Sequence, residues 1–222
     1  MITTSLLRRG WSYLTSEFFP RISMKRDAGP IDSVERVCEF ARTRAAFVAQ
    51  KKLFGYVKER MGMTYAKAFQ NDEMAQSLTI ATFEIYAACL SDLSVYCVAN
   101  AAAGDAFSNG DREAMARRAF REGLEANTSP GRGAEKREVW TAAFDDRLSK
   151  TFWTPPGEGE SRFTESGPAL VRWAPIAERL KTHDEEIVLN SIKFAWVEVR
   201  KDFLARLDRA GVARDWLASR PG

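Results

Sequence analysis

Two acidic residues, Glu84 and Asp92, stand inside the apolar stretch from residue 81 to residue 103. Paired carboxylates in apolar surroundings can act as a general acid and base, or hold a metal ion. On one α-helix, however, eight residues separate the two side chains by about 12 Å along the axis and by about 80° around it. One metal ion cannot bridge them directly at that distance. A di-iron bundle would also require Glu-x-x-His pairs, and the chain has a single histidine.

The acidic residues leave three interpretations of this stretch. A transmembrane helix would place them in hydrocarbon at a cost of roughly 2.5 to 3.5 kcal/mol for an acid near the centre, so we reject a membrane span. A core helix whose small-residue side lets another helix bring Arg or Lys against Glu84 is the favoured interpretation. The alternative is a small ligand pocket between helices, lined by Glu84, Ser91 and Asp92.

The remaining metal-binding and nucleophilic residue types are sparse. The three cysteines, Cys38, Cys89 and Cys97, have no C-x-x-C spacing, and His183 is the only histidine. Four zinc ligands are therefore not evident, and no G-x-S-x-G sequence presents a catalytic serine. We expect buried thiols in a reducing compartment, with neither a metal nor a cofactor, and the catalytic residues of any enzyme remain unknown.

The positive charge is concentrated at the N-terminus. Residues 1–30 hold five basic and two acidic residues, so the whole formal net charge of +3 falls in that segment. The neutral remainder argues against a nucleic-acid partner, because nucleic-acid-binding domains carry a basic face. The interruption of the apolar residues by Arg8 and Arg9 also argues against a secretory signal peptide.

Residues 1–30 form the first predicted unit, an amphipathic basic segment. Four apolar residues at helical spacing and five basic residues around them suit an anionic membrane surface or a groove on a partner protein. Two alternatives stay open, namely an ordinary first helix packed on the core and an organelle transit peptide. The predicted contact residues are Leu7, Arg8, Arg9, Trp11, Leu14, Phe18, Arg21, Lys25 and Arg26.

Residues 31–222 form the second predicted unit, and their apolar periodicity is helical throughout. Helices are expected over 31–62, 71–104, 111–127, 134–153, 168–181 and 184–211, with Asp32 opening the first in a capping-box-like spacing with Glu35 and Asn71 or Asp72 opening the second. Residues 154–168 hold three Pro, three Gly and three Glu, which predicts a long surface loop. Aromatic residues border it, so Trp153 and Phe163 join the candidate ligand pocket.

The sequence thus predicts an all-α protein, one bundle-like domain of about six or seven helices. The leading functional hypothesis is a non-catalytic cytoplasmic protein that binds a membrane surface or a partner protein through its N-terminal helix, with peripheral attachment to the inner face of a membrane as one location. The alternative is a protein or enzyme that binds a small apolar or amphiphilic ligand near Glu84 and the 154–168 loop. A homo-oligomer is left open.

Overall fold

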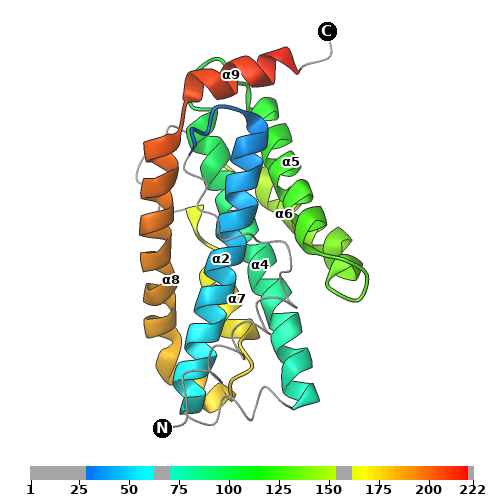
Figure 1. Ribbon diagram of the computed structural model, residues 1–222, viewed down its shortest axis with the longest axis vertical. Helices are drawn as coiled ribbons and strands as arrows, with labels where there is room; N and C mark the ends of the chain where they lie inside the picture. Colours follow the sequence, from blue (N-terminus) through cyan, green and yellow to red (C-terminus); the bar gives the residue numbers. More distant parts are fainter. Residues whose placement is uncertain (1–28, 63–70, 154–161, 220–222) are drawn as a thin grey trace.

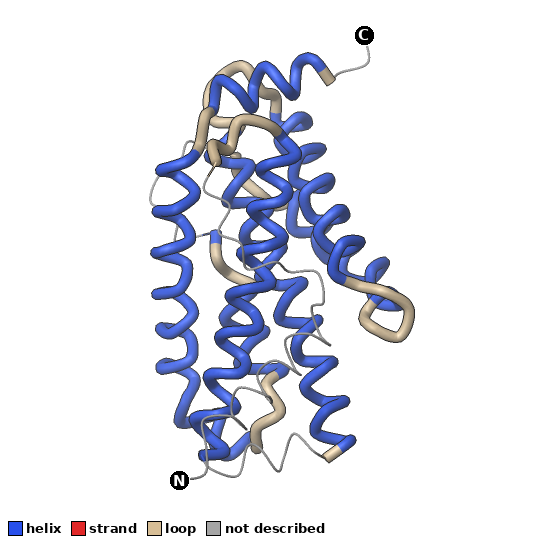
Figure 2. The backbone as a smooth tube through the Cα atoms, viewed as in Figure 1, coloured by secondary structure: helices blue, strands red, loops and turns tan. Residues whose placement is uncertain are grey.

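A computed structural model describes residues 29–62, 71–153 and 162–219 of the chain. Over these ranges the protein is all-α, with seven α-helices, one short 3-10 helix and no strand, as the sequence predicts (Figures 1 and 2). The elements are α2 (Val34–Met61), α4 (Asp72–Ala101), α5 (Asn109–Asn127), η2 (Ala134–Lys136), α6 (Arg137–Ser149), α7 (Ser166–Trp173), α8 (Glu178–Arg206) and α9 (Arg209–Ala218).

The central element is α4, which contacts α2, α5, α6, α7 and α9. From Ala81 to Ala101 only two of its residues, Glu84 and Ala88, are not fully buried. A helix that is apolar on all sides is stable only when neighbours surround it. By length and composition α4 could cross a membrane, but 78% of its most apolar window is buried inside the protein, as in the core helix of a bundle.

The long helix α2 lies lengthwise between α4 and α8, and α9 crosses one end of the bundle (Figure 1). Ser33, rather than the predicted Asp32, caps α2, because its side chain accepts a hydrogen bond from the Arg36 amide. The predicted end at Gly62 is confirmed, with a φ of 51° that suits glycine. Asn71, one of the two residues predicted to open α4, is its N-cap.

The C-terminal third of the chain differs from the prediction. α8 begins at Glu178 rather than at Asp184, which is buried inside the helix and pairs with Arg60. A buried carboxylate with a cationic partner can occupy a helix interior, although its sequence position resembles a first turn. Gly211 does not end α8. It lies in α9, where its missing side chain leaves room for the Asp32 backbone.

Residues 29–31 are tied to the far end of α8. The Ile31 amide donates to the Arg206 carbonyl at 2.8 Å, and the Asp208 amide donates to the Ile31 carbonyl at 3.0 Å. The Arg206 side chain also donates to the Gly29 carbonyl at 2.8 Å. The polypeptide therefore enters the described fold beside the C-terminal end of α8.

Candidate functional site

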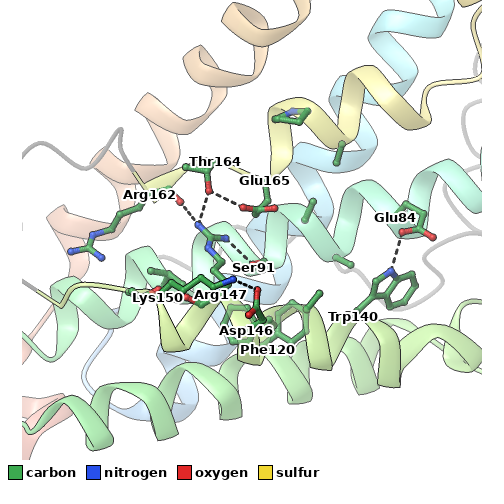
Figure 3. A pocket seen from close by; sticks show the side chains of 18 of the residues that line it. Glu84, Ser91, Phe120, Trp140, Asp146, Arg147, Lys150, Arg162, Thr164 and Glu165 are labelled. Carbon is green, nitrogen blue, oxygen red and sulfur yellow. Dashed lines mark hydrogen bonds and ion pairs between the residues drawn. The ribbon is translucent and has the colours of Figure 1, made fainter.

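A groove of about 930 Å³ lies beside Glu84 and Ala88, the partly buried residues of α4, and between that helix, α6 and α7 (Figure 3). Its floor is the small-residue side of α4 at Ala87, Ala88 and Ser91. Aromatic and charged side chains form its walls. The aromatic residues are Phe120, Trp140, Phe144, Phe152 and Trp173, the basic ones are Arg147, Lys150, Arg162 and Arg172, and the acidic ones are Asp146 and Glu165.

One end of the groove is the Glu84 end. Glu84 accepts hydrogen bonds from Lys136 at 2.5 Å and from the Trp140 indole N–H at 3.0 Å, and its side chain is 12% exposed. The Lys136 ammonium also lies 5.4 Å from the centre of the Trp173 ring. The prediction that a neighbouring cation meets Glu84 is therefore confirmed, and the aromatic rings gather around this ion pair.

The other end holds the guanidinium of Arg147 (Figure 3). This group donates to Ser91 Oγ at 2.7 Å and to the Arg162 carbonyl at 2.6 Å, and it contacts Asp92 at 2.9 Å. Arg147 therefore joins α4, α6 and the segment before α7. Ser91 faces this end of the groove, as predicted for a pocket residue.

Asp92 belongs to the core rather than to the groove. Its carboxylate accepts hydrogen bonds from the amides of Thr164, Glu165 and Ser166 at 3.2, 3.1 and 2.9 Å. These are the free amides at the start of α7, which a carboxylate stabilises. This capping explains why α7 begins at Ser166, inside the predicted 154–168 loop.

The other two predicted pocket residues also lie outside the groove lining. Trp153 is 9% exposed and belongs to the core. The Phe163 ring packs 5.3 Å from Tyr96 and 4.9 Å from Trp196, centre to centre. Instead the groove uses Phe152, next to Trp153 in the chain, which is 84% exposed. In a short segment between helices, neighbouring side chains point in different directions, and spacing alone does not say which one faces the site.

Arg147 is not among the site residues predicted from the sequence, although its spacing carries a signal. Trp140, Ala143, Phe144 and Arg147 follow the i, i+3, i+4, i+7 spacing of one helical face. A basic residue on an otherwise apolar face is an indication that an acid or a ligand lies opposite. Here the acid is Asp92.

The charges at the Arg147 end influence one another. Burial and the nearby Arg147 lower the pKa of Arg162 below its usual value. An anion placed between such groups would offset their mutual repulsion. No cluster of three or more His, Cys, Asp or Glu side chains that could hold a metal occurs in the part of the chain that the structure describes.

The predicted contact residues of the N-terminal segment, from Leu7 to Arg26, lie outside the described residues. Their binding to an anionic membrane surface or a partner protein stays a prediction. No protein-family model matches the chain, no curated protein matches it, and no solved structure matches it.

Proposed function

We propose that the protein binds a small amphiphilic anion in the groove beside α4. The observation that carries this proposal is that α4, buried on every other side from Ala81 to Ala101, is left open at Glu84 and Ala88 alone. A central helix whose neighbours part over one short stretch creates a site for a molecule other than the chain itself.

The apolar part of the ligand would lie on the floor of the groove. Ala87 and Ala88 leave room above α4, and Trp140 with Phe144 supplies an aromatic wall. Phe152, which is 84% exposed at the rim, would lose contact with water when a ligand binds. From Glu84 to Ser91 the floor spans about 10 Å, which suits a bicyclic ring system or a medium-length acyl chain.

The anionic part would lie at the Arg147 end. Arg147, Lys150 and Arg162 line this end together with Asp146 and Glu165, and Arg147 pairs with Asp92 while Lys150 pairs with Asp146. Ion pairs therefore lie at both ends of the groove, and the basic residues that line it outnumber the acidic ones by four to three. We propose binding rather than catalysis because Glu84 and Arg147 are engaged in internal hydrogen bonds.

The test uses two twelve-carbon probes that differ only in headgroup charge, dodecanoate and dodecyltrimethylammonium, titrated calorimetrically below their micellar concentrations. Dodecanoate should bind at least about tenfold more tightly, because its headgroup meets Arg147, Lys150 and Arg162. Ala143→Trp should fill the groove and weaken dodecanoate binding about tenfold or more, whereas Ala142→Trp is the matched control. Both alanines are exposed on α6, and only Ala143 lines the groove.

Arg162→Gln should reduce the preference for the anionic probe while leaving the binding of dodecanol unchanged. Equal binding of both charged probes would contradict an anionic ligand. Dodecanoate binding that Ala143→Trp leaves intact would place the ligand elsewhere.

A further inference from the structure

Arg172 lines the groove without the kind of partner that two other basic residues there have. Arg147 contacts Asp92 at 2.9 Å, and Lys150 contacts Asp146 at 2.6 Å. The guanidinium of Arg172, in contrast, contacts neither a carboxylate nor another hydrogen-bond acceptor within residues 29–62, 71–153 and 162–219, and the residue is exposed. Arg172 therefore brings to the groove a positive charge that no carboxylate of these ranges neutralises.

The Trp173 ring gathers two cations at the Glu84 end of the groove. The Arg172 guanidinium lies over this ring at 5.3 Å from its centre, and the Lys136 ammonium lies over it at 5.4 Å. Lys136 is held by Glu84, so two positive charges meet one carboxylate around the ring. Two like charges this close together repel each other, and an anion bound beside Arg172 would offset that repulsion.

The position of Arg172 is fixed by the backbone of α7. The helix begins where the Ser166 amide donates to Asp92 at 2.9 Å, and six further residues carry it about 9 Å toward the Glu84 end. The carbonyl of Arg172 accepts a hydrogen bond at 2.9 Å from the ammonium of Lys181, a residue that is 6% exposed. α7 therefore holds Arg172 at the end of the groove opposite to Asp92.

The groove thus has an arginine at each end of an apolar floor. Arg162 lines one end and Arg172 lines the other, and the floor between them includes Ala87 and Ala88. Figure 3 shows Arg162 and Glu84 at opposite ends of the groove. A linear ligand with one acidic group would leave Arg172 without a counter-charge, whereas a ligand with an acidic group at each end would meet both arginines.

We propose, on the basis of the anion binding proposed above, that the ligand is a linear amphiphile with an acidic group at each end, such as a medium-chain dicarboxylate. Arg172 binds the second acidic group and selects such ligands over those with a single acidic group. A guanidinium can hold a carboxylate through two parallel hydrogen bonds, which adds geometric specificity to the charge. The floor of about 10 Å keeps the two acidic groups apart.

The test compares decanedioate with ω-hydroxydecanoate, which has the same ten-carbon chain and one carboxylate but ends in a neutral hydroxyl. In calorimetric titrations of the full chain, decanedioate should bind at least about tenfold more tightly. Arg172→Gln should remove this preference and change the affinity for ω-hydroxydecanoate by no more than about twofold. Arg179→Gln is the matched control, because Arg179 is exposed on α8 and does not line the groove.

Equal binding of the two probes to the unsubstituted protein would overturn the second acidic group, even if dodecanoate still binds in the groove. A preference that persists in Arg172→Gln, or that Arg179→Gln also removes, would overturn the role of Arg172. An equal loss of both probes in Arg172→Gln would mean that a single headgroup binds there. If neither probe nor dodecanoate binds, the groove is not a binding site, and the proposed function fails as well.

Discussion

The two ends of the groove-facing part of α4 carry the same kind of residue in opposite surroundings. At one end Glu84 keeps its carboxylate at the rim of the groove, where Lys136 and Trp140 hold it. At the other end Asp92 is completely buried and binds three backbone amides and Arg147. Both residues interrupt one apolar run, and hydropathy does not distinguish them.

The difference shows that a carboxylate in an apolar helix is defined by its partners rather than by its neighbours in sequence. In place of water, the Glu84 carboxylate contacts the Lys136 ammonium and the Trp140 indole, and the lysine side chain is 44% exposed. In place of water, the Asp92 carboxylate contacts four donors, namely Arg147 on α6 and the amides of Thr164, Glu165 and Ser166 at the start of α7. The first carboxylate shapes a surface groove, and the second joins three parts of the chain.

The largest change in the free energy of unfolding is expected for a substitution at Asp92. Asp92→Asn should lower the free energy of unfolding by about 3 to 5 kcal/mol, because it removes the partner of a largely buried guanidinium and weakens the cap of α7. Urea denaturation measures the change. Asp146→Asn is the control, since Asp146 pairs with Lys150 at the exposed surface and should cost less than about 1 kcal/mol.

This prediction is sensitive to the protonation state of Asp92. Burial raises the pKa of this carboxyl, while Arg147 and the amides of Ser166 and Glu165 act in the opposite direction. If the carboxyl were neutral in the fold, Asp92→Asn would be nearly isosteric. A loss below about 1 kcal/mol would therefore contradict a buried ion pair at this end.

The reactivity of cysteine thiols distinguishes the buried face of α4 from its partly open face, because positions 88 and 89 are adjacent and lie on different faces. Burial and the charge of Asp92 raise the pKa of the Cys89 thiol well above its ordinary value of 9.0, and burial raises the pKa of Cys38 to about 12. A raised pKa keeps the thiol protonated, so at pH 8 the thiolate fraction falls by about a thousandfold for a pKa of 12. The native cysteines should therefore react very slowly with iodoacetamide.

The thiol introduced by Ala88→Cys stands at the opening on α4, because Ala88 is only partly buried and lines the groove. It should react at least about a hundredfold faster than Cys89, as measured by mass spectrometry of the labelled peptides. Full labelling of all thiols in urea is the control. Equal rates at the two positions would contradict the contrast between an open face and a buried face.

The smallest effect is expected at the Glu84 end. Glu84→Gln should cost no more than about 1 kcal/mol, because Lys136 can turn to water and the glutamine oxygen can still accept from Trp140. The loss should shrink in 0.5 M NaCl, whereas the loss in Asp92→Asn should not, since buried pairs are poorly screened. A salt-independent cost above about 2 kcal/mol would show that both carboxylates are structural core elements.

Part of the candidate site was predictable from local patterns. Glu84 and Ser91 share the small-residue side of α4, and both line the groove. Asp92, Trp153 and Phe163 were assigned to the same pocket, but the structure buries Asp92 and Trp153 in the core and packs the partly buried Phe163 against it. Phe163 precedes α7, whose start depends on Asp92, 74 residues before Ser166 in the chain.

The sequence by itself determined the helical class, the positions of most helices and the burial of α4. These properties follow from spacing of apolar residues and from caps such as Asn71, which act within a few residues. Only the tertiary structure decided that α4 opens at Glu84 and Ala88, that Asp92 caps α7, and that Arg147 lies between them. The physical reason is that groove and cap depend on side chains from helices far apart in sequence, and no local pattern encodes which of those side chains meet.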